Sequence, residues 1–232
     1  MTTAARCRET AEAAWRWVLD QVRHDDLGPW IPASVTDPPA TEAPWDRDGM
    51  HSGVGGLAHL LAELRRSREW TAEESGLAEA IGRRLREATA TKTVVNFFDG
   101  VVSDIGVFAL LGEEGIESSV ARLLELEPES WPRMNDATLG TGALVVGGLR
   151  AAENGSADGL RLTARAADLL LAEAEETPAG LNWLFVPRRL VPEEKLDRGR
   201  VVEMPNWSHG LAGIAGVLAQ ACLLYTSDAA DE

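Results

Sequence analysis

The chain has few cysteines, few basic residues and no long apolar run, and each shortage excludes a class of protein. Its 232 residues include two cysteines, Cys7 and Cys222, which cannot build a disulfide framework or a cysteine-rich metal site. The N-terminal stretch has no basic flank followed by an apolar run, so no signal peptide is visible. No apolar stretch reaches membrane-spanning length. These features predict a soluble, cytoplasmic protein.

Acidic residues outnumber basic ones, 37 to 22, which gives a net charge of -15 at pH 7. This balance argues against nucleic acid or an anionic membrane surface as a partner, and we interpret it mainly as an aid to solubility. Hydrophobic residues make up 45% of the chain. This share can form a sizeable core, in one large domain or two small ones.

Helical periodicity is the pattern that the sequence has in abundance. Apolar residues recur at the spacing of one buried helix face within residues 14–22, 57–64, 77–85 and 160–170. Convincing alternating strands are absent, because the apolar runs 94–98 and 184–186 are too short to outline a sheet. The predicted fold class is therefore all-α. The irregular stretch 186–205 is the expected place for substrate access.

A segment of small residues that leads into an apolar helix occurs four times. Each copy has a small residue, two further residues, a second small residue and then the helix. The copies begin at Gly53, Ser103, Gly140 and Gly210. Glycine permits tight turns of positive φ and a close approach of backbone to backbone, although close helix packing alone also explains small residues. The repeat predicts inner helices that begin at small residues and outer helices that wrap them.

Chemistry-bearing residues lie at the third and fourth copies. His209 precedes the fourth helix, and because histidine exchanges protons near neutral pH it is a catalytic candidate. Asp136 precedes the third helix, where it is either a catalytic residue or an N-terminal cap. Asn206 and Trp207 are candidates for substrate binding, with packing as the alternative role of the tryptophan. Two histidines of the first copy are predicted to be structural: His51 and His59.

These motifs resemble those of the lanthionine synthetase C-like (LanC-like) cyclases. Asp136-Ala137-Thr138-Leu139-Gly140 is similar to the family's Asp-x-x-x-Gly at the third inner helix. Ser208-His209-Gly210-Leu211-Ala212-Gly213 resembles its His-Gly-x-x-Gly at the fourth. The resemblance implies an incomplete α/α toroid of the six-hairpin type, with about four of the six inner helices present. The chain departs from the family's glycines at two positions, and the replacing residue is small at both: Ser103 in the second copy and Ala143 in the third.

The resemblance also implies an activity, peptide modification in lanthipeptide biosynthesis. Members of the family add the thiol of a peptide cysteine to a dehydroamino acid, which forms a thioether, and the partner here is expected to be a peptide or a small thiol such as glutathione. By resemblance, His209 donates or relays the proton that the enolate needs, and Asp136 orients it or helps to deprotonate the thiol. Zinc is the implied cofactor, since it favours the thiolate.

The family's zinc ligands have no counterpart in this chain. Members hold zinc through two cysteines and a histidine of the fifth and sixth inner helices, and no such Cys and Cys-His pair occurs here. Residues 222–232 resemble the translation of a transposase-derived sequencing adapter known from metagenomic assemblies, so Cys222 is not counted as a ligand. We therefore expect residues 1–221 to be a partial toroid, an inactive fragment that holds no zinc. Its uncovered apolar helix faces predict low stability or aggregation.

Two other functions compete with this hypothesis. A non-catalytic toroid could bind peptides or glutathione as a scaffold or sensor. Another α/α toroid enzyme, glycoside-active or isoprenoid-cyclising, needs paired carboxylates or acidic clusters at the barrel mouth. The carboxylates available for that chemistry are Asp99, Asp104 and Asp136. Sequence beyond Ala221 with a Cys and a later Cys-His, each opening a glycine-marked helix, would favour the zinc cyclase.

Overall fold

The computed structural model describes residues 2–32, 47–126, 131, 134–196 and 204–228, and these are mostly helical. The helices are α1 (Thr3–Gln21), α2 (Leu57–Ser67), α3 (Ala72–Thr89), α4 (Val101–Leu111), α5 (Ile116–Glu125), α6 (Thr141–Glu153), α7 (Ala157–Ala172), α8 (Glu193–Leu196) and α9 (Leu211–Asp228). Two short 3-10 turns are η2 (Val54–Gly56) and η4 (Arg188–Leu190). The all-α prediction is confirmed, and the four periodic stretches lie in α1, α2, α3 and α7.

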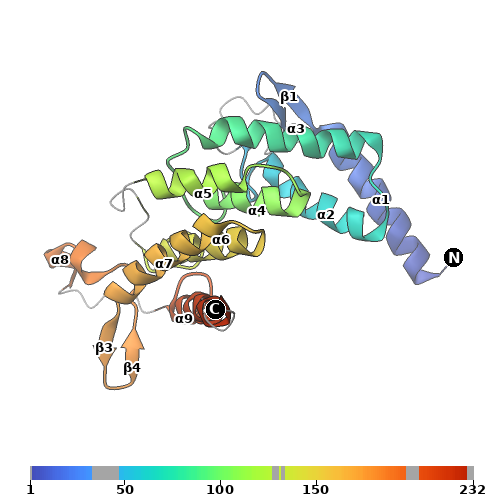
Figure 1. Ribbon diagram of the computed structural model, residues 1–232. Coiled ribbons are helices and arrows are strands. Elements are labelled where there is room, and N and C mark those ends of the chain that lie inside the picture. Colours follow the sequence, from blue (N-terminus) through green and yellow to red (C-terminus); the bar gives the residue numbers. More distant parts are fainter. Residues whose placement is uncertain (1, 33–46, 127–130, 132–133, 197–203, 229–232) are drawn as a thin grey trace.

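Two small antiparallel hairpins interrupt the helices at places that the sequence did not mark as strands. β1 (Arg23–Asp25) pairs with β2 (Gly28–Trp30), and β3 (Glu175–Thr177) pairs with β4 (Gly180–Asn182). Figure 1 shows the second hairpin projecting from the end of α7. Within the described ranges, no helix combines the length and apolarity needed to cross a bilayer.

The helices alternate between two layers. One layer is α2, α4, α6 and α9, each packed on the next, and the other is α3, α5 and α7 (Figure 1). Helix α4 contributes to two buried clusters, one shared with α1, α2 and α3 and the other with α5, α6, α7 and α9. The helices that follow the small-residue segments are therefore neighbours in space. This arrangement brings the loops that precede them to one end of the layer.

The backbones of these four loops are bonded within and between loops in a repeated way. In three of them the N–H that follows the loop's glycine donates to the carbonyl seven residues earlier, at 2.8–3.0 Å. These bonds are Val101 N to Val94 O, Thr141 N to Met134 O and Leu211 N to Met204 O. Single backbone bonds also join each loop to the next. They are His51 N to Phe98 O, Phe97 N to Thr138 O and Ala137 N to Ser208 O.

The loop glycines are needed for space and not for positive φ. At each of them a Cβ would lie nearer than 3.0 Å to backbone of its own loop. They are Gly53, Gly100, Gly140 and Gly210, and none of them has a positive φ. The expected close approach of backbones is thus confirmed, whereas the positive-φ explanation is wrong for these positions. The second copy begins at Gly100, three residues before the predicted start, because Ser103 takes the closing small position.

Replacing Gly140 by alanine is expected to destabilise the fold. Its Cβ would overlap the carbonyl oxygen of Met134, which already accepts a hydrogen bond from Thr141 and cannot move away freely. We expect a loss of about 1–3 kcal/mol in the free energy of unfolding, measured by urea denaturation. Gly76 is the matched control, since its Cβ would meet nothing within 4 Å in α3, and alanine there should stabilise by about 0.5–1 kcal/mol. Equal effects at both positions would contradict the packing argument.

A buried carboxylate, Glu74, ties α1 to the start of α3. Its oxygens accept from Trp15 Nε1 at 2.6 Å and from Arg68 at 2.8 Å, and it completes a capping box with Thr71. The Arg68 guanidinium is the main cause that lowers the pKa of Glu74 to about 2. Because the folded-state pKa is lowered, this stabilisation is present above the ordinary pKa of 4.5 and is lost as the pH falls toward 2.

The Glu74→Gln variant is therefore expected to lose roughly 2–3 kcal/mol of stability at pH 7 and almost none near pH 2. The measurement is the free energy of unfolding as a function of pH. Glu73→Gln is the control, because Glu73 lies in the same helical turn and is exposed. A Glu74→Gln loss that stays constant from pH 7 to pH 2 would show that charge is not its origin.

Helix α9 continues past Ala221 to Asp228, into the stretch that resembles an adapter translation. The run Cys222-Leu223-Leu224-Tyr225 contains no helix breaker, so helical backbone extends through it; residues 229–232 lie outside the described part. Large apolar side chains are exposed on several elements. They are Trp17, Leu27, Leu60, Leu171, Leu181, Trp207 and Leu223. The low stability expected for this chain stays a prediction.

Candidate functional site

His209 is positioned by the loop that precedes α9. Its backbone N–H donates to the side-chain oxygen of Asn206 at 2.8 Å, which closes a short turn. The next residue, Gly210, begins the close backbone packing described above. The preceding carbonyl, of Ser208, accepts from Ala137 N of the third loop at 3.1 Å. The fourth loop is therefore fixed against the third at the histidine.

Asp136 uses its two carboxylate oxygens for two different tasks. Oδ1 accepts from the backbone N–H groups of Thr138 and Leu139 at 2.6 and 2.7 Å, and from the Thr138 hydroxyl at 2.9 Å. Oδ2 lies 2.6 Å from Nδ1 of His209. The aspartate side chain is fully buried, and the histidine side chain is 40% exposed. The structure thus brings together the two predicted catalytic residues, 73 positions apart.

This geometry determines which nitrogen of His209 is available. Because Oδ1 receives two backbone N–H groups, the ionised carboxylate fits the site, and an ionised carboxylate can only accept hydrogen bonds. Nδ1 of His209 therefore carries a proton and donates it to Oδ2. Among the described residues, Nε2 has no hydrogen-bonding partner. It can accept a proton when the ring is neutral and donate one when the ring is charged.

The two other predicted site residues precede His209 in the fourth loop. Asn206 is exposed, and its side-chain oxygen stabilises the turn, so it has a local structural task. Trp207 is 52% exposed, and its Nε1 lies near Gly216 of α9. The Phe185 ring meets His209 edge to face, with centroids 6.1 Å apart. Sequence reasoning did not find Phe185, because the short run 184–186 has no periodic pattern.

The histidines of the first copy have different surroundings. His51 contacts Ser52 Oγ at 3.2 Å and lies edge to face against Phe98, with ring centroids 5.4 Å apart. His59 is exposed on α2 and lines a small pocket of about 70 Å³ between α2, α4 and α6. Neither residue has a carboxylate partner among the described side chains. The first copy therefore does not repeat the Asp136–His209 pair.

The described residues do not fit a zinc site. Cys7 lies on α1 and Cys222 on α9, and both are exposed. In the part of the chain that the structure describes, no group of three or more His, Cys, Asp or Glu side chains could hold a metal ion. The Asp136 carboxylate is already committed to the loop and to His209.

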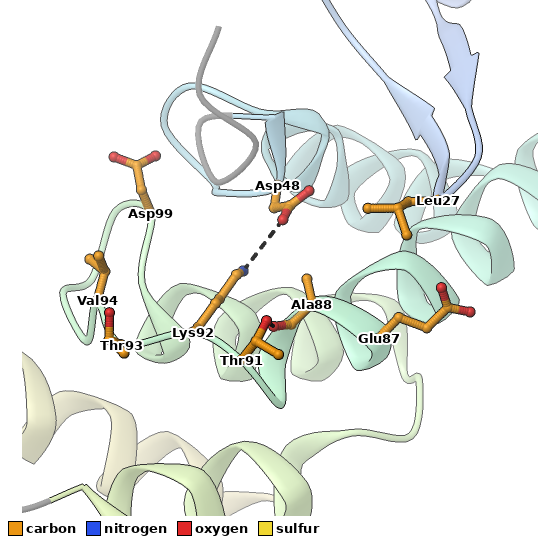
Figure 2. Close-up of a pocket in the computed structure, with 9 residues that line it drawn as sticks. All are labelled: Leu27, Asp48, Glu87, Ala88, Thr91, Lys92, Thr93, Val94 and Asp99. Carbon is orange, nitrogen blue, oxygen red and sulfur yellow. Dashed lines mark hydrogen bonds and ion pairs between the residues drawn. The ribbon is translucent and has the colours of Figure 1, made fainter.

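A second polar centre, which sequence reasoning missed, lies below a cleft of about 410 Å³ between the first loop and the end of α3. Figure 2 shows Lys92 of this cleft pointing toward Asp48, 4.0 Å away. Lys92 is 7% exposed, and its Nζ lies 2.6 Å from Oδ1 of the fully buried Asp104. Arg84 binds Asp48 at 2.7 Å from the other side. The ionic groups at the floor of the cleft are therefore engaged with one another.

Burial raises the pKa of the Asp104 carboxyl to about 6, although Lys92 and Thr89 oppose the rise. Asp99 lines the cleft, and its Oδ1 accepts from Ser52 N at 3.3 Å. Each of the three carboxylates considered for glycoside chemistry thus has a different partner: Ser52 N for Asp99, Lys92 and Thr89 for Asp104, and His209 for Asp136.

Comparisons with protein-family models, with curated proteins and with solved structures find no match to this chain.

Proposed function

We propose that residues 1–221 belong to a lanthionine synthetase C-like enzyme and supply the proton-transferring pair for the addition of a thiol to a dehydroamino acid. The observation that carries this proposal is the 2.6 Å contact between Asp136 and His209. The two residues lie in the third and fourth copies of one loop design, as the motif order of that family requires. The alternation of α2, α4, α6 and α9 with α3, α5 and α7 supports an incomplete α/α toroid.

The proposed reaction makes one sulfur–carbon bond. Neutral His209 takes the thiol proton on Nε2, while Nδ1–H stays bonded to Asp136. The thiolate sulfur then bonds to Cβ of the dehydroamino acid, the Cα–Cβ π bond breaks, and its electron pair moves to the enolate. His209 returns the proton from Nε2 to Cα. The thiol proton is thereby transferred to carbon, and the product is a thioether with no net loss of atoms.

Asp136 contributes by fixing the histidine through the 2.6 Å contact at Nδ1. It also keeps Nε2 as the reacting atom in both protonation states. Zinc stays part of the proposal for a full-length parent only, with ligands outside the described residues, and the proton transfers above do not pass through a metal.

The test is an assay of the protein that contains residues 1–221 in its natural sequence context. The substrate is a peptide with one cysteine and one dehydroalanine, and in a second arm glutathione with a dehydroalanine peptide. Cyclisation leaves the peptide mass unchanged but removes the thiol from alkylation by iodoacetamide, whereas glutathione addition increases the mass by one glutathione. Binding of either ligand with full retention of the free thiol would instead support a non-catalytic scaffold and would refute the enzyme.

A further inference from the structure

The segment that follows β4 is anchored in the core before it reaches the site. Trp183 is buried, and its Nε1 donates to the Leu170 carbonyl in α7 at 2.7 Å. Leu184 is buried beside it. Phe185 follows; it is partly buried, and its ring lies against His209. Two consecutive buried side chains therefore hold the backbone from which Phe185 projects.

Asn135 attaches this segment directly to the residue before Asp136. Its backbone N–H donates to the Phe185 carbonyl at 2.8 Å, and its side-chain Nδ2 donates to the Leu184 carbonyl at 2.8 Å. The asparagine is 2% exposed, so both bonds are shielded from water. Phe185 and Asp136 are consequently held at fixed positions relative to one another, and both contact the same imidazole.

An imidazole held by one hydrogen bond at Nδ1 can still tilt about the line from Cβ to Nδ1, and the His209 side chain is 40% exposed. The edge-to-face contact with Phe185, at an interplanar angle of 78°, supplies a second restraint. Two restraints on one ring fix the direction in which Nε2 points. Proton transfer to carbon depends on that direction, since reactivity falls steeply with misalignment.

We propose that Phe185 is a positioning residue that orients the His209 ring for proton transfer at Nε2, with Asn135 holding Phe185 in place. This inference rests on the proposed thiol addition. It differs from a general packing role because the aromatic ring, and not apolar bulk alone, makes the contact. The His51–Phe98 pair, which joins the first and second loops, provides a matched comparison, since it also has edge-to-face ring geometry and no aspartate partner among the described residues.

The first measurement is made on the full chain and needs no activity. The four histidines, His24, His51, His59 and His209, give four sets of imidazole NMR signals. Phe185→Leu should shift the ring signals of His209 and leave those of the other three in place, whereas Phe98→Leu should shift those of His51 alone. Unchanged His209 signals in Phe185→Leu would overturn the proposal. Shifts at all four histidines would also overturn it, since they would indicate general packing.

The second measurement is the rate of thioether formation by the protein that contains residues 1–221 in its natural sequence context. Phe185→Leu should lower kcat by roughly 10- to 100-fold with KM unchanged, and Phe185→Tyr, which keeps the ring, should restore it. A leucine variant within about twofold of wild type, or a tyrosine variant as slow as leucine, would overturn the proposal. If the wild-type protein forms no thioether, the proposed function fails, while the NMR arm still decides whether Phe185 restrains His209.

Discussion

Replacing His209 by asparagine is expected to lower the rate of thioether formation by roughly 10²–10⁴-fold, the usual contribution of a positioned acid or base. Asparagine can donate from its amide to Asp136 and so preserve the contact between the third and fourth loops. It cannot exchange a proton near neutral pH. The loss should therefore appear in kcat, with the binding of an unreactive peptide unchanged. The measurement is the steady-state rate of the alkylation-based assay.

His51→Asn is the matched control for this experiment. His51 lies in the equivalent loop of the first copy and packs on Phe98, but among the described residues its ring bonds only to Ser52 Oγ. The control should retain wild-type activity. A His209→Asn enzyme that keeps its activity within about tenfold would refute the assignment of His209 as the proton carrier.

Replacing Lys92 by methionine is expected to destabilise the protein by about 3–5 kcal/mol at pH 8, because it leaves the buried Asp104 carboxylate without its cation. Thr89 Oγ1, at 2.8 Å, would be the remaining side-chain partner of Asp104. Asp48 would keep its ion pair with Arg84. The measurement is the free energy of unfolding from urea denaturation at pH 8 and at pH 5.

The pH dependence identifies the cause. The folded-state pKa of Asp104 is raised to about 6 from 3.8, so the native protein binds a proton more readily than the unfolded chain. The resulting stabilisation is fully present below 3.8 and is lost as the pH rises through about 6. In Lys92→Met the pKa of Asp104 should be raised further, because its neighbouring cation is gone. Part of the stability lost at pH 8 should therefore return at pH 5.

Two further variants complete this test. The double variant Lys92→Met with Asp104→Asn removes both charges and should recover most of the stability at pH 8. Arg66→Met breaks an exposed ion pair with Glu63 at 3.1 Å and should cost less than about 0.5 kcal/mol. If the double variant is as unstable as Lys92→Met, lost packing and not an unpaired charge is responsible.

The fold could be predicted from the sequence where local pattern decides it. The apolar faces around Trp15, Leu61 and Ile81 do lie in helices, and all three side chains are buried. The second copy was placed three residues too late. Gly100 stands four residues after Asn96, whose side chain accepts from Phe98 N and Asp99 N. Asp136 has the same position and the same kind of bonds before Gly140. This equivalence of Asn96 and Asp136 becomes clear only in three dimensions.

The pairing of Asp136 with His209 was predictable because repeated loops place equivalent positions at one end of neighbouring helices. Asn135, Phe185 and Lys92 were not predictable in the same way. Asn135 and Phe185 meet through backbone bonds between a repeat loop and the segment after a hairpin. Lys92 reaches Asp104 across the connection between α3 and α4, and Lys92 belongs to no sequence motif. Contacts of this kind depend on tertiary packing and leave no periodic signal.

The most direct test of the proposed proton carrier is the tautomer of His209, read from the ¹⁵N signals of its ring in the full chain at a pH where the imidazole is neutral. The 2.6 Å contact with Asp136 predicts a proton on Nδ1 and a bare Nε2. Asp136→Asn should disturb this preference in His209 and in no other histidine. A neutral His209 with its proton on Nε2, or a tautomer that Asp136→Asn leaves unchanged, would contradict the pairing on which the account depends.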